Sequence, residues 1–341
     1  MDLLFAVFVC LCLWGVNRPA AEGIRNRDGL ARTDTNAMRG ILAVLIVFHH
    51  LSLTTNAGYS AIILKKIGFL VVAAFYALSG YGLLMSYLAK GCRLDHFWRK
   101  RCTGVIFPYL IISLIYVAVR LALGEKVTVV SYLLSFVNGT PMVRYSWFIL
   151  TILVFYVFYY LAARIAKQDV PLMIFLVFVA EVFFLYGMKK LDFEPFWYDA
   201  AWAFPLGMVW AYGYRSISET VSRHPWVYIG LTAMLFVIFY FSSTVLSWCG
   251  FYGEMLTACT FAVLVMLSMF KLRFSNPALQ FLGNISFELY LMHGLFIMVF
   301  SRSEMLMRKP ILLAAAVIAC AVISAWLMHI LLQKCLFKKG A

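Results

Sequence analysis

The sequence predicts an all-α integral-membrane protein, and three of its features lead to this class. The 341 residues are 64% hydrophobic and 17% aromatic, whereas only 13% are charged. A water-soluble domain of this length could not bury so much apolar surface, but lipid can cover it. The apolar residues are also grouped into long stretches separated by short basic loops. A polytopic helical bundle has this pattern, because helices satisfy their own backbone hydrogen bonds in lipid.

About 11 apolar stretches are candidates for transmembrane helices, several of them near the short end of the roughly 17–25 residues that a span needs. They cover approximately residues 2–16, 40–58, 67–89, 102–123, 146–163, 170–188, 196–213, 225–243, 251–270, 278–300 and 311–332. A shorter apolar run at 127–137 is expected to form a surface or partly inserted helix.

The net charge of +14 is explained by membrane topology. If the N-terminus lies outside, roughly twice as many lysines and arginines fall in cytoplasmic loops as in outward loops. This bias follows the positive-inside rule and places the C-terminus in the cytoplasm. The distribution therefore predicts a multi-pass protein of the cell membrane, surrounded by membrane lipid, with no nucleic-acid partner.

Two parts of the chain are distinguished. Residues 1–34 are expected to form an additional N-terminal transmembrane helix and a cytoplasmic basic loop, and residues 35–341 the main membrane domain. The first apolar run has no basic residue before it, which favours an uncleaved helix over a signal peptide. The eight cysteines include no CxxC pair, so neither a disulfide framework nor a metal site is predicted.

The stretch at 40–58 carries His49 and His50 and follows Arg39. An ionisable group at bilayer depth is by default a functional hypothesis. Eleven residues of helix advance about 16 Å and rotate about 20° beyond three turns, so Arg39 and His50 lie on nearly one face. A boundary cation in line with a buried imidazole suits a long ligand with an anionic head and a reactive tail, such as acyl-CoA. An interfacial arginine with a histidine bonded to another helix fits the spacing too.

Five stretches, in order, resemble the motifs of acyltransferase family 3, the integral-membrane acyltransferases that modify bacterial surface polysaccharides and related glycans. The first is similar to the family's R-x10-H signature, and the others to its later helices and basic loop. They are "RGILAVLIVFHHL" (39–51), "VAAFYALSGYGLL" (72–84), "FWRKRCTGVIFPYL" (97–110), "YSWFILTILVFYVFYYL" (145–161) and "FLGNISFELYLMHGLF" (281–296). The resemblance covers about residues 35–332.

The resemblance implies that Arg39 and His50 act in coenzyme A handling and acyl transfer. It also implies that Ser79 and Gly80 supply a polar contact and a close helix approach. The acidic residue that many relatives carry before the paired aromatics is replaced by Ala73, so no mechanism that needs a carboxylate there is expected.

The basic loop departs from the family pattern. Arg101 matches the first arginine of the family's R-x-x-R loop, but Gly104 stands at the second position. Arg99 or Lys100 is expected to substitute for it in binding the phosphates of coenzyme A. A cytoplasmic charge run is otherwise what topology alone produces.

Polar residues of the late helix form a stripe, since Ser286, Tyr290 and His293 fall at i, i+4 and i+7. Such a stripe is typical of hydrogen bonding between helices. Tyr290 and His293 are therefore expected to support the site or the acceptor, with direct catalysis as the alternative. Glu288 lies off the stripe and could orient a histidine on another helix. Trp147 is either an interface anchor or a platform for a sugar.

The predicted function is a membrane O-acyltransferase, specifically an acetyltransferase, that uses acetyl-CoA as donor and no metal. The acceptor is expected to be a glycan or lipid-linked sugar at the outer face, with His50 as general base. Direct transfer and a covalent relay through Ser79 both remain open, as do an oligomer and a separate extracytoplasmic partner.

Two other classes of protein are weighed. One is a proton-coupled transporter with a relay of ionisable residues, and the other a haem protein with two axial histidines. The relay would use His50, Glu181, Glu288 and His293, and the haem ligands would be His50 and His293.

Overall fold

The computed structural model describes residues 1–17, 29–55, 58–274 and 276–336. Its described part is 81% helical, with two short strands, β1 (Val16–Asn17) and β2 (Arg273–Phe274), paired antiparallel. This confirms the all-α class. The basic loop expected within residues 1–34 falls largely at 18–28, outside the described residues.

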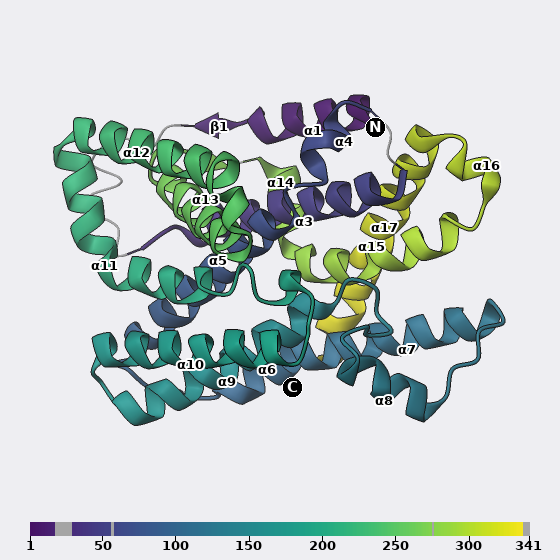
Figure 1. The fold of residues 1–341 in the computed structure, drawn as a ribbon, viewed down its shortest axis with the longest axis horizontal. Coiled ribbons are helices and arrows are strands. Elements are labelled where there is room, and N and C mark those ends of the chain that lie inside the picture. The colour runs from purple at the N-terminus through teal and green to yellow at the C-terminus, as the bar shows by residue number, and fades with distance from the viewer. Residues whose placement is uncertain (18–28, 56–57, 275, 337–341) are drawn as a thin grey trace.

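Figure 1 shows the helices, most of them roughly parallel to the long axis of the molecule. The chain forms α1 (Asp2–Leu13), α3 (Arg32–Thr55), α4 (Ser60–Leu64), α5 (Gly68–Leu88), α6 (Phe97–Arg101), α7 (Phe107–Ala122), α8 (Val129–Val137), α9 (Trp147–Ala166), α10 (Val170–Lys190), α11 (Ala203–Arg223), α12 (Pro225–Thr244), α13 (Phe251–Lys271), α14 (Pro277–Asn284), α15 (Ser286–Phe300), α16 (Glu304–Met307) and α17 (Pro310–Leu336), with single turns η1 (Cys102–Ile106), η2 (Pro195–Trp197) and η3 (Leu246–Cys249).

Eight helices of the described chain are long and apolar enough to cross a membrane. The count rises to nine if α14 and α15, which meet at 74°, form one broken span. The protein is therefore a multi-pass membrane protein. Two of the expected spans differ from the helices that the structure shows. Helix α1 has 12 residues and is about 18 Å long, less than the roughly 30 Å of a hydrocarbon core. The span expected at 196–213 becomes α11, which begins at Ala203 and runs into a polar last turn.

Helix α5 lies in the interior and packs against α3, α11 and α13. Its contact with α11 depends on two glycines. A Cβ at Gly80 would collide with the carbonyl oxygen of Phe204, and one at Gly207 with that of Ala77. Small residues allow such close approach between membrane helices. Gly80 therefore lies at a close approach of two helices, as the family resemblance implied.

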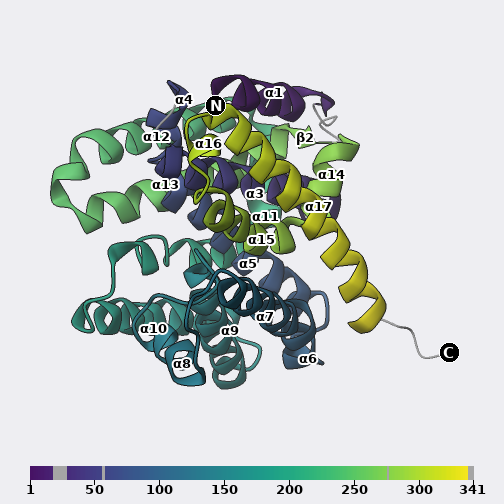
Figure 2. The same ribbon diagram turned by 90° about the vertical axis from the view of Figure 1, so that its right-hand side faces the viewer.

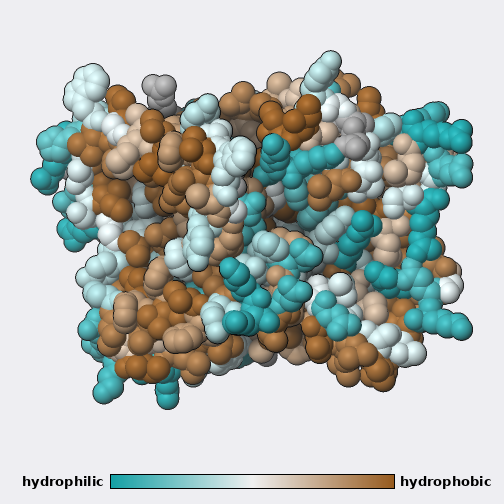
Figure 3. All heavy atoms as spheres, in the orientation of Figure 1, coloured by the Kyte–Doolittle hydropathy of each residue, from teal (hydrophilic) through white to brown (hydrophobic). Residues whose placement is uncertain are grey.

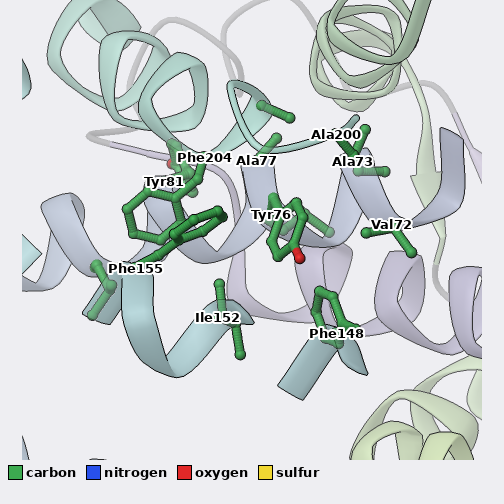
Figure 4. Close-up of a cluster of buried hydrophobic side chains, with 14 of the residues drawn as sticks. Val72, Ala73, Tyr76, Ala77, Tyr81, Phe148, Ile152, Phe155, Ala200 and Phe204 are labelled. Carbon is green, nitrogen blue, oxygen red and sulfur yellow. The ribbon is translucent and has the colours of Figure 1, made fainter. Parts of the chain in front are cut away.

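An aromatic core lies beside this contact. Figure 4 shows Tyr76 between Phe148 and Phe155, with its hydroxyl pointing toward Phe148. The ring of Tyr76 lies 5.0 Å from that of Phe148 and 5.1 Å from that of Phe155. These contacts join α5 to α9 and fix the position of the segment that begins α9.

Helix α3 is held against α14 by another close contact. A Cβ at Gly40 would lie 2.6 Å from the carbonyl oxygen of Leu279, and one at Gly283 would collide with the backbone of Asn36. The Asn36 side chain donates to the Asn284 Oδ1 atom at 2.8 Å. Arg39 lies on α3 between Asn36 and Gly40, so this contact positions its side chain.

The periphery is apolar. In the candidate span of α12 only 6% of the residues are buried, as expected of a helix in contact with lipid. Figure 3 shows hydrophobic atoms over much of the face near α10, α12 and α13, while hydrophilic atoms gather near both ends and in the centre. Figure 2 shows α17 lying diagonally across one side of the molecule.

Candidate active site

Two cavities lie on either side of Tyr290, whose side chain lines both. We call the larger one, about 560 Å³, the histidine chamber; its walls include His49, His50, Arg144, Tyr145 and Trp147. The smaller one, about 200 Å³, is the arginine cavity; its walls include Arg39, Ser79, Arg101, Tyr156 and Ser286. The stripe on α15 therefore runs along the boundary between the two spaces.

A chain of hydrogen bonds orients His50. Its Nδ1 atom lies 2.8 Å from Nε2 of His293, and Nδ1 of His293 lies 3.2 Å from the carbonyl oxygen of Leu289. A carbonyl oxygen only accepts, so the neutral His293 ring carries its proton on Nδ1 and accepts at Nε2. The proton of His50 is then on Nδ1, which leaves a lone pair on its Nε2. The His50 ring, held in this tautomer, lines the histidine chamber.

Tyr145 covers one face of this imidazole. The two rings are stacked, with centroids 3.7 Å apart and planes 6° from parallel. The backbone of Tyr145 has a φ of 67°, in the left-handed region that a bulky residue rarely adopts. The hydroxyl of Tyr290 donates to the Tyr145 carbonyl oxygen and holds this conformation. Strained residues of this kind gather at functional sites.

The arginine cavity joins three elements. Arg39 comes from α3, and its Nη2 atom approaches α5 at Gly82. The guanidinium of Arg101 lies 4.9 Å from the ring centre of Tyr156 on α9. Such a cation–π contact holds the arginine in place and leaves its positive charge available to an anion. The cavity therefore offers two guanidinium groups and the hydroxyl of Ser79.

The other residues predicted for the site lie elsewhere. Glu288 accepts a hydrogen bond from Nδ1 of His329 on α17 at 3.0 Å, so it contacts a histidine on another helix, as suggested, but that histidine is not His50. Lys100 lines a smaller neighbouring cavity together with Arg101. Arg99 is exposed and lines none of the cavities described here.

An ion-pair network lies at the edge of the histidine chamber. Arg120 donates to Glu125 at 2.6 Å, and Arg302 donates to the other carboxylate oxygen. The hydrogen bond from Arg120, with the charges of both arginines, holds the pKa of Glu125 below its ordinary value. The carboxylate therefore stays charged and ties the loop after α7 to the segment after α15.

Two residues of the site were not predicted, and a third, His49, was expected to face away from it. Tyr145 and Arg144 lie just before α9, and Arg144 stacks over the Tyr145 ring at 4.9 Å. Tyr145 is the first residue of the motif at 145–161, but nothing in its local sequence indicates that it stacks on a histidine. His49 bonds the Leu64 carbonyl at 2.8 Å and also lines the chamber, although its place on α3 is turned away from Arg39.

The fold and the site together define a class: a multi-pass membrane protein with a buried histidine that lines one of two adjoining cavities. The chain matches the family described as "Acyltransferase domain" over residues 33–330, and it belongs to that family. Membership of this family shows that the protein is an acyltransferase. Neither the curated proteins nor the solved structures compared with the chain include a match.

The site geometry also bears on the haem alternative. Two axial imidazoles on opposite faces of one haem iron each place a nitrogen about 2 Å from it, so these nitrogens lie about 4 Å apart. The nitrogens of His50 and His293 that face each other are 2.8 Å apart and are joined by a hydrogen bond. The pair is therefore a hydrogen-bonded couple.

Proposed function

We propose that this protein is an O-acyltransferase of the cell membrane that moves an acetyl group from acetyl-CoA to a hydroxyl of a glycan or lipid-linked sugar. The observation that carries the proposal is the pair of cavities that meet at Tyr290, one with the lone pair of His50 and one with Arg39 and Arg101. In this proposal the arginine cavity faces the cytoplasm and the histidine chamber faces outward, as the positive-inside bias favours. No metal takes part.

The donor enters through the arginine cavity. Arg39 and Arg101 bind the acidic part of coenzyme A, and the pantetheine arm extends along α3 toward Tyr290. Arg39 and His50 are on one helix, about 16 Å apart along its axis, which is a distance that such an arm can cover. The thioester carbon thereby reaches the boundary of the histidine chamber.

The acceptor occupies the histidine chamber, whose volume of about 560 Å³ suits one or two sugar rings. Trp147 provides an aromatic face in its wall. His50 takes the proton of the acceptor hydroxyl at Nε2, and the oxygen forms a bond to the thioester carbon. The carbon–sulfur bond then breaks, and the proton passes to the leaving thiolate. The products are the ester and free coenzyme A.

Direct transfer is preferred to a relay through Ser79. Ser79 lines the arginine cavity, on the other side of Tyr290 from the base. An acyl-serine intermediate would need a base of its own there. Transfer that persists in Ser79→Ala supports the direct route, whereas a trapped acyl group on Ser79 supports the relay.

The enzyme is tested with purified protein, radiolabelled acetyl-CoA and oligosaccharide acceptors. We expect His50→Gln to lower transfer about 10²–10⁴-fold, the usual contribution of a general base, while coenzyme A binding persists. His329→Gln is the matched control, since that histidine bonds Glu288 outside both cavities. Full activity of His50→Gln would overturn the role of His50 as general base. Substrate flux across proteoliposomes without acyl transfer would overturn the enzyme in favour of a transporter.

A further inference from the structure

Two more cavities continue from the arginine cavity. The first is a narrow space of about 30 Å³ lined by Tyr87, Lys90, Lys100 and Arg101, and it shares Arg101 with the arginine cavity. The second has about 530 Å³ and shares Tyr87, Arg93, Leu94 and Asp95 with the first. The three spaces therefore form a series, which we call the basic track.

The far end of the track is formed by residues that the acyl-transfer chemistry does not use. We call this second cavity the end cavity; besides the shared residues it is lined by Cys92, Tyr160, Arg164 and Lys167. It lies between the loop after α5 and the C-terminus of α9. Tyr160 gives it an aromatic wall, and three cations give it a positive one.

The cations of the end cavity are poorly neutralised. Arg93 pairs with Asp95 at 3.4 Å, and Asp95 is the acidic residue in the cavity wall. Within the described chain, Arg164 and Lys167 form no ion pair with a carboxylate. The positive-inside rule accounts for cations on this side, but it does not require them to converge on one cavity from two separate elements.

The backbone around the end cavity is strained. Cys92, His96 and Lys167 have φ values of 59°, 55° and 56°, in the left-handed region. Across the described residues only Tyr145 and Asp192 share this conformation among the non-glycine residues. The Tyr87 hydroxyl donates to the Lys167 carbonyl oxygen and joins the two loops that carry the strain. Backbone strain that surrounding contacts hold in place is often found at ligand clamps and active sites.

We propose that the end cavity binds the 3′-phosphorylated nucleotide end of coenzyme A, which deepens and rests on the proposed function. The adenine packs against Tyr160, and the 3′-phosphate binds Arg164 and Lys167. The diphosphate lies at Arg101, where the arginine cavity meets the narrow middle of the track, with Arg39 on one side and Lys90 and Lys100 on the other. The pantetheine arm extends further into the arginine cavity. A volume of about 530 Å³ lies within the range of roughly 300–1,000 Å³ typical of ligand sites.

The proposal is tested by comparing acetyl-CoA with acetyl-dephospho-CoA, which lacks the 3′-phosphate. We expect the wild-type protein to use acetyl-CoA with a kcat/KM about 10–100-fold higher, as for the loss of a charge-assisted hydrogen bond. Lys167→Gln and Arg164→Gln should lower kcat/KM for acetyl-CoA but not for acetyl-dephospho-CoA. The preference for the donor with the 3′-phosphate should therefore disappear in these variants. Arg215→Gln is the matched control, because Arg215 pairs with Glu219 away from the track and should retain the preference.

The outcomes separate the two proposals. If neither donor supports transfer, the proposed function fails. If the wild-type protein uses both donors equally well, the function stands and the nucleotide site is wrong. A second readout is alkylation of Cys92, quantified by mass spectrometry, with the exposed Cys249 as internal reference. Coenzyme A should protect Cys92 in detergent. Protection by phosphatidylglycerol nanodiscs and not by coenzyme A would assign the cavity to a lipid phosphate and overturn the proposal.

Discussion

The Nδ1 atom of His50 on α3 lies 2.8 Å from the Nε2 atom of His293 on α15. The two residues are separated by 243 positions in the chain, and the backbone carbonyl of Leu289 ends the hydrogen-bond chain. In serine hydrolases a carboxylate orients the histidine base. Here a second imidazole and a carbonyl fix the tautomer of His50 without an added charge, as suits a site within a membrane.

His293 should act by positioning His50. In His293→Phe the Nδ1 atom of His50 loses its acceptor, so the lone pair is no longer held on Nε2. We expect kcat to fall about 10–100-fold with little change in KM for the donor, and His293→Asn, which can accept through its side-chain oxygen, to recover part of the loss. Steady-state kinetics with varied acetyl-CoA measure both. A change in donor KM alone would contradict the positioning role.

Tyr290 should couple the two cavities. Tyr290→Phe keeps the ring in both walls but removes the hydrogen bond to the Tyr145 carbonyl oxygen. Tyr145 is then free to leave its left-handed conformation and the face of His50. We expect a loss of about 0.5–1.5 kcal/mol in stability and a several-fold lower kcat. Thermal unfolding and kinetics test this. Tyr132→Phe is a control, since its hydroxyl bonds Ser113 outside both cavities.

Gly80 should be intolerant of any side chain. An added Cβ would collide with the backbone of Phe204, so Gly80→Ala must push α5 and α11 apart. Overpacking of this kind costs typically about 1–3 kcal/mol. Gly230→Ala on α12 is the matched control, because open space surrounds that position and alanine is the better helix former. A thermal unfolding assay in detergent should show a lower midpoint for Gly80→Ala only.

Local patterns in the sequence predicted much of this arrangement. The distance between Arg39 and His50 follows from helix geometry alone, and both residues lie in cavities that meet at Tyr290. The spacing of Ser286, Tyr290 and His293 correctly indicated one polar stripe. These predictions succeed because each depends on the period of a single helix.

Relations between helices were not predictable in the same way. The stacking of Tyr145 on His50 joins segments about a hundred residues apart, and no local pattern encodes it. The 74° bend at Ile285 was missed because apolar residues continue through it, although Asn276–Pro277 and Gly283–Asn284 are helix-boundary signals. The series of cavities beyond Arg101 likewise depends on how α9 lies against the loop after α5.

Glu125 should make the edge of the histidine chamber sensitive to acid. Its pKa is lowered by the hydrogen bond from Arg120 and by the two arginine charges. A lowered folded-state pKa contributes stability that is present above the unfolded value, near 4.5, and is lost as the pH falls through the folded-state value.

The contribution is modest, about 0.2–1 kcal/mol, because the pair is partly exposed and water screens it. Wild-type protein should therefore lose more stability than Glu125→Gln when the pH is lowered from 7 to below 4, and the two should approach each other at the acid end. Unfolding midpoints across this range provide the measurement, and Glu304→Gln, whose pair with Arg308 is fully on the surface, is the control. Parallel pH profiles for wild type and Glu125→Gln would show that the two arginines do not hold the carboxylate in its charged form.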